Sequence, residues 1–228
     1  GTIARTIFAG GILQYDVDVA GQVVSVELAT RGGETVLQPG AAVTLSWRAQ
    51  DVSRMESVRV QLSGNRIKAY GRIVAAATDI HPAFSASYDL VTDESGATKR
   101  LSLTVTLAQR ERQLSIARDE ENMWLVQDHQ NQARRAAYNG ALDVDVVFSP
   151  FFNALPIRRT GLHNRTASVS LPVVYVRVPD LTVESVTIGY SSDGPGKPIK
   201  LDSPVADTAI TVDDDGFILD YPGLAERI

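Results

Sequence analysis

The stretch that decides the fold is DVDVVFSPFFNALPIRRTGL, which runs from Asp143 to Leu162. Within it, a strand-like alternation of apolar residues stops at Ser149-Pro150, a pair typical of a helix N-cap and first helical turn. The segment Pro150–Arg159 then gathers aromatic, amide and cationic side chains. We expect a short helix there, and Pro156 keeps that helix short or kinked.

Around this stretch, apolar and polar residues alternate along much of the chain. The alternation is clear in Val58–Leu62, Leu101–Leu107 and Val169–Val173, and turn signals such as Asn139-Gly140 recur at short intervals. This pattern is typical of strands joined by tight turns. The sequence therefore predicts an all-β, mainly antiparallel fold.

The composition narrows the classes of protein that this chain can belong to. The 228 residues carry a net charge of −5 with dispersed basic residues, which argues against nucleic acid or an anionic membrane surface as a partner. The absence of cysteine excludes disulfides and cysteine-based zinc sites. His81, His129 and His163 have no paired spacing, so we expect no metal site. Trp47 and Trp124 lie in alternating patterns and are predicted to be at least half buried.

Longer sequence patterns exclude two further classes. The chain has no apolar run long enough to span a bilayer. It also lacks the GxxxxGK(S/T) loop that cradles nucleotide phosphates, so ATP binding is not expected. We expect a cytoplasmic protein without a cofactor or a transmembrane segment.

A change in pattern near Val52–Met55 predicts two domains. Residues 1–52 contain no lysine and end in a turn, a strand and a polar exit, whereas a new alternating strand begins after Met55. We expect a small β segment over 1–52 and a main domain over 55–228.

The N-terminal segment resembles a TOBE domain. The resemblance rests on the opening GTIARTIFAGGILQYDVDVAGQVVSVEL (1–28) and the closing LQPGAAVTLSWRAQDV (37–52). It implies a small OB-like β-barrel of the kind found at the C-terminus of many ABC-importer ATPases, where it helps to regulate or dimerise the ATPase. Here it stands without a nucleotide-binding loop.

The main domain resembles the family called "Putative glycolipid-binding". The family carries a DVDxxFSPxxNxLPIRR motif and a later DYPGL motif, which occur here as DVDVVFSPFFNALPIRR (143–159) and DYPGL (220–224). The resemblance implies a spiral β-roll wrapped around a single short helix. It also implies homodimers and binding of a glycolipid or another lipid.

Two adjacent arginines are candidates for contact with a ligand head. Arg158 and Arg159 have guanidinium groups that pair well with phosphate or carboxylate. The alternative is that one of them pairs with Asp143 or Asp145 and locks the helix to the sheet. Because neighbouring residues on a helix face different directions, we expect one structural arginine and one that is more exposed.

The two aspartates of the first motif form a second candidate group. Asp143 and Asp145 lie two apart on a predicted strand and therefore share a face, which points away from the core or into a polar lumen. Paired carboxylates can exchange protons or hold a cation. The alternative is an ion pair or a turn cap.

Apolar and amide side chains of the predicted helix are candidates for lining a lumen. Phe151, Phe152 and Leu155 can contact acyl chains, while Asn153 and the strand residue Tyr175 can offer polar edges. The alternative for the aromatic residues is an ordinary hydrophobic core.

These observations lead to a prediction of function. We expect non-catalytic binding of an amphipathic ligand, a glycolipid or acyl compound, in a lumen between sheet and helix. A small-substrate enzyme that uses Asp143 or Asp145 as its acid or base is one alternative. The other is a structural or dimerisation module without a ligand.

Overall fold

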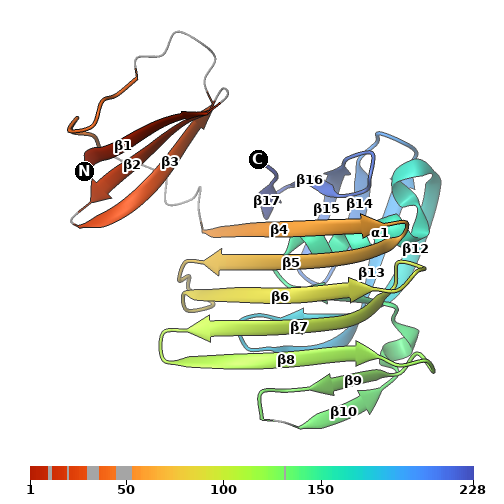
Figure 1. Ribbon diagram of the computed structural model, residues 1–228. Helices are drawn as coiled ribbons and strands as arrows, with labels where there is room; N and C mark the ends of the chain where they lie inside the picture. Colours follow the sequence, from red (N-terminus) through yellow and green to blue (C-terminus); the bar gives the residue numbers. More distant parts are fainter. Residues whose placement is uncertain (10–11, 20, 30–35, 45–52, 131) are drawn as a thin grey trace. The chain divides into compact units, whose positions relative to one another are not determined.

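The computed structural model describes residues 1–9, 12–19, 21–29, 36–44, 53–130 and 132–228. Contacts between Cα atoms divide the chain into two units, Gly1–Val52 and Ser53–Ile228. Each unit is described by itself below, and Figure 1 gives the labels of the strands and the helix.

The first unit is a small antiparallel sheet with the strand order β1-β2-β3. The strands are β1 (Thr2–Ala9), β2 (Ile12–Val19) and β3 (Gln22–Ala29). Its core contains the buried side chains of Ile3, Leu13, Tyr15 and Val17. Trp47, predicted to be half buried, lies outside the described residues.

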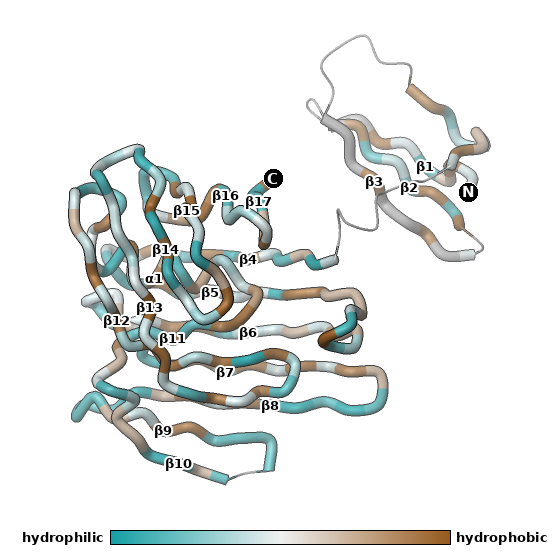
Figure 2. Tube along the Cα trace, turned by 180° about the vertical axis from the view of Figure 1, so that it is seen from behind, coloured by the Kyte–Doolittle hydropathy of each residue, from teal (hydrophilic) through white to brown (hydrophobic). Residues whose placement is uncertain are grey.

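The second unit begins with an antiparallel seven-stranded sheet in the order β10-β9-β8-β7-β6-β5-β4. Side chains alternate between buried and exposed along β5 and β6, as expected for a sheet with one face on a core. Figure 2 shows the same alternation of hydrophobic and hydrophilic residues along these strands. The strands are β4 (Arg54–Ser63), β5 (Arg66–Ala75), β6 (Phe84–Thr92), β7 (Thr98–Leu107), β8 (Arg110–Arg118), β9 (Trp124–Gln127) and β10 (Ala133–Ala136).

A second seven-stranded sheet follows in the order β11-β12-β13-β14-β15-β16-β17. Its strands are β11 (Asp143–Val146), β12 (Thr166–Arg177), β13 (Thr182–Asp193), β14 (Ile199–Ser203), β15 (Ala206–Val212), β16 (Ile218–Tyr221) and β17 (Ala225–Glu226). The pair β11 and β12 is parallel, and the other pairs of this sheet are antiparallel. The parallel pair arises because the chain crosses over through a helix between these two strands.

The crossover contains the α-helix predicted from the sequence. A 3₁₀ turn η2 (Pro150–Asn153) leads into α1 (Ala154–Thr160), and Gly161 ends the helix in a left-handed conformation with φ of 69°. Pro156 is tolerated because it lies in the first turn of α1, where backbone N–H groups have no helical acceptor. Two further 3₁₀ turns are η1 (Tyr138–Gly140) and η3 (Leu162–Asn164).

The predicted helix cap at Ser149 is wrong in one respect. Ser149 does precede the first turn, but its hydroxyl makes no capping bond. It donates instead to Glu56 Oε1 on β4, at 2.5 Å, and Tyr88 donates to the same oxygen at 2.8 Å. A buried carboxylate needs such donors, and this need outweighs the gain from capping a short 3₁₀ turn.

The helical segment lies between the two sheets and contributes to two cores. Phe152 and Leu155 pack in the core of the first sheet together with Trp124, whose predicted burial is confirmed by an exposed fraction of 0%. Ile157 and Leu162 pack in the second core, on the inner face of the sheet β11–β17. The fold is therefore all-β and mainly antiparallel, with curled sheets around one short helix, as predicted.

Candidate functional site

The strand β11 brings the two aspartates of the first motif into the interior. Val144 and Val146 belong to the core of the first sheet, so Asp143 and Asp145 face the opposite side, toward α1 and the second core. Both are buried, with exposed fractions of 0% for Asp143 and 9% for Asp145. Two carboxyl groups two residues apart therefore share one buried face.

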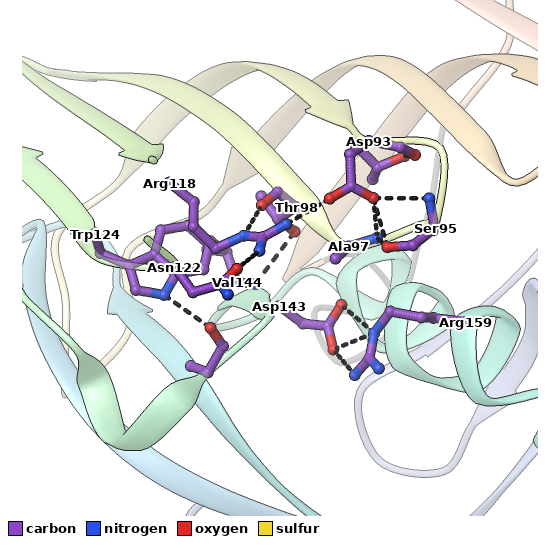
Figure 3. A network of polar contacts seen from close by, with 12 residues as sticks. Asp93, Ser95, Ala97, Thr98, Arg118, Asn122, Trp124, Asp143, Val144 and Arg159 are labelled. Carbon is purple, nitrogen blue, oxygen red and sulfur yellow. Dashed lines mark hydrogen bonds and ion pairs between the residues drawn. The ribbon is translucent and has the colours of Figure 1, made fainter. Parts of the chain in front are cut away.

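Asp143 forms the predicted ion pair with an arginine of the helix. The Arg159 Nη2 atom lies 2.6 Å from Asp143 Oδ2, and Arg159 Nε donates to both carboxylate oxygens at 3.2 and 3.3 Å. Burial raises the pKa of Asp143, and Arg159 opposes this rise. The pair fixes the C-terminal end of α1 to the start of β11, as Figure 3 shows.

A second arginine network lies beside this pair. Arg118, at the end of β8, donates to Asp93 Oδ2 at 2.6 Å and to the carbonyl of Thr98 at 2.9 Å. In Figure 3 both networks surround the start of β11, where the Thr98 N–H donates to the carbonyl of Leu142 at 2.9 Å. This end of the motif therefore joins the two sheets.

The other arginine, Arg158, is held by the turn before β16. Its guanidinium lies 4.5 Å from the centroid of the Phe217 ring, and it donates to the carbonyl of Asp215. Arg158 and Arg159 are both partly exposed, and they differ in their partners: Arg159 pairs with a buried carboxylate, whereas Arg158 donates to a backbone carbonyl.

Asp145 has a different environment from Asp143. Burial, with a smaller contribution from the negative charge of Asp143, raises the pKa of Asp145 to about 7, and a hydrogen bond from the Val146 backbone opposes the rise. Within the residues that the structure describes, no arginine, lysine or histidine forms an ion pair with Asp145. Asp145 is thus a buried acid without a cationic partner there.

Asp145 interacts with three buried tyrosines, Tyr175, Tyr190 and Tyr221. Burial raises the pKa of each tyrosine, and the negative charge of Asp145 raises it further. The Tyr190 hydroxyl donates to Asn153 Oδ1 at 3.0 Å. The buried hydroxyl of Tyr175 has no hydrogen-bond partner. An unsatisfied buried hydroxyl costs about 1–3 kcal/mol, so this group needs an explanation.

A small cavity of about 20 Å³ connects these groups. We call it the Asp145 cavity; its polar lining includes Asp145, Ser149, Asn153, Tyr175, Ser203 and Tyr221, and its apolar lining includes Phe148, Val205 and Leu224. A volume of this size holds one group about as large as a water molecule.

The Asp145 cavity is the place where the two sequence motifs meet. Asp145, Phe148 and Ser149 come from DVDVVFSP, while Tyr221 and Leu224 come from DYPGL. The sequence marked both motifs, but their separation along the chain gave no sign that they are neighbours. Tyr221 and Leu224 were therefore missed as site residues.

Phe148 was also missed, because the alternating pattern placed it on a strand. The strand β11 ends at Val146, and Phe148 has a φ of 74°, which is rare and costly for a bulky residue. Its ring lies 3.7 Å below the guanidinium of Arg54 and 5.4 Å from the ring of His81. These contacts hold a strained aromatic residue at the wall of the cavity.

Comparisons with known proteins identify the family of the chain. Residues 44–227 match the family model described as "Putative glycolipid-binding". The chain belongs to this family. Residues 1–55 match the model of the TOBE domain.

The fold of this chain is similar to that of a solved structure. It is the crystal structure of a DUF1089 family protein from Pseudomonas aeruginosa, 24% identical, with a TM-score of 0.63 over 84% of this chain and 100% of that chain. At this identity the likeness shows the fold alone. No curated protein matches the chain.

Three of the residues predicted to line a lumen, Phe151, Phe152 and Leu155, lie in the packed core of the first sheet. Phe152 is 0% exposed, Leu155 1% and Phe151 8%. The ring of Tyr88 lies 5.0 Å from that of Phe152 and 6.1 Å from that of Phe151. None of these three residues, and neither Arg158 nor Arg159, lines the Asp145 cavity.

A larger hollow of about 460 Å³ lies on β13–β15 and the turn before β14. Its lining includes Asp193, Lys197, Lys200 and Asp207, so both signs of charge are present. Among the described residues, no group of acidic or histidine side chains is arranged to hold a metal ion. No helix within the described residues is long and apolar enough to cross a membrane.

Proposed function

We propose that the chain binds an amphipathic molecule, without catalysis, at the Asp145 cavity. The observation that carries the proposal is the meeting of the two family motifs at one small cavity with a polar interior. A fold built only for stability would gain by satisfying the hydroxyl of Tyr175 and by avoiding the unpaired carboxyl of Asp145. The chain keeps both beside a strained Phe148, and such strain concentrates at binding and catalytic sites.

The lining of the cavity divides a ligand into two parts. A small polar head fits the interior near Asp145, while an apolar tail lies over Phe148, Val205 and Leu224. Val205 is 55% exposed, so apolar surface is open to a tail at this point. Each methylene group that the tail buries contributes about 0.8 kcal/mol.

This proposal changes the roles of the residues that the sequence suggested. Asp145, Asn153 and Tyr175 remain ligand-binding residues, and Asp143 and Arg159 hold the helix in place. Phe151, Phe152 and Leu155 pack in the core of the first sheet, away from the proposed ligand.

Arg158 lies outside the proposed site. Homodimer formation and a link to an ABC importer stay predictions from the two resemblances, and a cytoplasmic location stays a prediction from the composition.

Native mass spectrometry of the purified protein tests the proposal. We expect a co-purified amphiphile, or retention of one added in detergent-free buffer, and weaker retention after Leu224→Ala. Leu125→Ala is the matched control, because Leu125 is 48% exposed on β9 and does not line the cavity. Equal retention by both variants would refute the assignment of the site.

A second function, acid–base catalysis on a small substrate, is favoured by one observation. The pKa of Asp145 is raised to about 7, which is suitable for proton transfer near neutral pH. Asp143 suits this role less well, because Arg159 holds it as a charged partner. Turnover of chromogenic glycosyl or acyl esters that disappears in Asp145→Asn would support an enzyme, and absence of turnover across such a panel would count against it.

A further inference from the structure

The two buried aspartates of β11 differ in one respect that points to a ligand. Asp143 has a guanidinium partner at 2.6 Å, whereas none of the described residues supplies a cation to Asp145. Ionised carboxylates in protein interiors are paired, or they take up a proton. A group that brings its own positive charge into the Asp145 cavity would complete this site in the way that Arg159 completes the other.

Other groups of the cavity suit a cation. Phe148, Tyr175 and Tyr221 supply aromatic rings, whose faces attract positive charge. The Tyr175 hydroxyl has no partner and can accept an N–H bond. The Ser203 hydroxyl of the same cavity already accepts from the N–H groups of Val205 and Ala206. A carboxylate, a free hydroxyl acceptor and aromatic rings together match a primary ammonium group, which has three donors and no acceptor.

Size and charge disfavour the other kinds of polar head. A cavity of about 20 Å³ admits a group the size of water or ammonium, whereas a phosphate or a sugar ring does not fit without movement of the walls. A phosphate would also meet the like charge of Asp145. Arg177 lies 5.2 Å from the centroid of the Tyr175 ring, but it is already paired with Glu184 at 2.6 Å.

We propose that the Asp145 cavity accepts the primary ammonium head of an amphiphile, with the Asp145 carboxylate as its counter-ion. This inference rests on the proposed function, since it names the head of the ligand that the cavity binds. The ligand class is an alkylamine or an amino-bearing lipid. Tyr175 positions the ammonium by accepting one of its hydrogen bonds.

The proposal sets the direction of a pH effect. In the free protein the pKa of Asp145 is about 7, so the carboxyl is mostly neutral at lower pH. Burial raises the pKa values of the neighbouring Tyr175, Tyr190 and Tyr221, which therefore stay protonated. Asp143, which also faces this side, is held by Arg159. An ammonium ligand binds the ionised carboxylate, so its affinity rises as the pH rises.

Three probes with the same tail separate the head from the rest of the ligand. We would titrate the full chain calorimetrically with octylammonium chloride, octyl glucoside and octyl phosphate, at about pH 5.5 and about pH 8, on either side of the Asp145 transition. We expect octylammonium to bind about 10- to 100-fold more tightly than octyl glucoside at the higher pH. Its advantage should shrink about tenfold or more at the lower pH.

Two variants and one control complete the test. Asp145→Asn should remove the preference for octylammonium, and Tyr175→Phe, which keeps the ring, should reduce it. Asp207→Asn removes one exposed charge from the same sheet, so it should leave the preference unchanged. Thermal melts establish that each variant is folded.

The outcomes distinguish the two levels of the proposal. Equal binding of octylammonium and octyl glucoside, or a preference that survives Asp145→Asn, would overturn the ammonium assignment and leave amphiphile binding standing. If none of the three probes binds, the proposed function fails together with this inference.

Discussion

Asp143 and Asp145 show how much one neighbour changes the role of a residue. They share a strand, a face and deep burial, yet only Asp143 is neutralised by an arginine. Because Asp143 is paired with Arg159, it holds β11 and α1 together. Because Asp145 has no such partner, its pKa stays at about 7 and its carboxyl group is available to a ligand.

The raised pKa of Asp145 predicts a loss of stability with rising pH. The pKa of about 7 in the folded state exceeds the ordinary aspartate pKa of 3.8, so the folded state holds this proton more tightly. The folded state is therefore favoured at low pH, and this advantage is lost between about pH 4 and pH 8, by up to about 4 kcal/mol. Urea unfolding at both ends of this range should show that Asp145→Asn removes that part of the pH dependence. An unchanged dependence in the variant would contradict the buried, unpaired carboxyl.

The two arginines should differ sharply in their contribution to stability. Arg159→Ala leaves the buried Asp143 without its partner and should cost about 3–5 kcal/mol of unfolding free energy. Arg158→Ala loses a partly exposed stacking contact with Phe217 and should cost about 0.5–1 kcal/mol. Urea denaturation of the two single variants measures both. Similar costs for the two would show that the Asp143–Arg159 pair does not hold the helix.

At the scale of elements, a close contact ties three strands of the first sheet together. Tyr88 on β6 pairs with Gly71 on β5, and its ring crosses over that glycine to reach Glu56 on β4. A Cβ atom at position 71 would lie 2.0 Å from the Tyr88 Cζ atom. The overlap can be relieved only if the Tyr88 ring moves, which would break its hydrogen bond to Glu56.

Gly71→Ala should therefore destabilise the sheet by about 1–3 kcal/mol or more. Tyr88→Ala also destabilises, but adding Gly71→Ala to it should cost much less than in the wild-type background. The double-mutant cycle, measured by thermal or urea unfolding, gives this coupling. Additive costs would mean that Tyr88 does not cover the glycine.

The sequence predicted those elements whose signals are local. Period-two alternation indicated the strands, and Ser149-Pro150 marked the break that leads into α1. The sequence also predicted that one arginine of the motif pairs with Asp143 or Asp145, but only the structure shows that the pair is Arg159 with Asp143. The parallel pairing of β11 with β12 was not predicted, since it depends on where the crossover returns.

The Asp145 cavity was beyond local reasoning for a physical reason. It depends on contacts between β11, the turn after β14 and the turn after β16, which are far apart along the chain. Phe148 fitted an alternating pattern, and only the fold shows that its backbone leaves the strand at a φ of 74°. The packing of the helical residues into both cores likewise depends on contacts between distant strands, which local sequence patterns do not show.

At the scale of the whole molecule, the chain consists of two units with separate cores. The second unit, Ser53–Ile228, contains both seven-stranded sheets, both family motifs and the Asp145 cavity. Among the described residues, both of its cores are built from side chains of the second unit.

We therefore predict that residues 55–228 fold on their own. The truncated chain should be soluble and should unfold cooperatively, because the buried clusters of the second unit stay complete. Circular dichroism during urea or thermal unfolding measures this. An insoluble product, or one that melts without cooperativity, would mean that the units depend on each other.

The central claim is that the meeting point of the two motifs binds an amphiphile. The most direct test is a two-dimensional amide NMR titration of the full chain with octylammonium and octyl glucoside. The account predicts that the amides shifted by at least one probe cluster at Val146–Ser149, Ser203–Val205 and Tyr221–Leu224. Shifts confined to the outer hollow around Lys197 and Lys200, or no shifts with either probe, would contradict it.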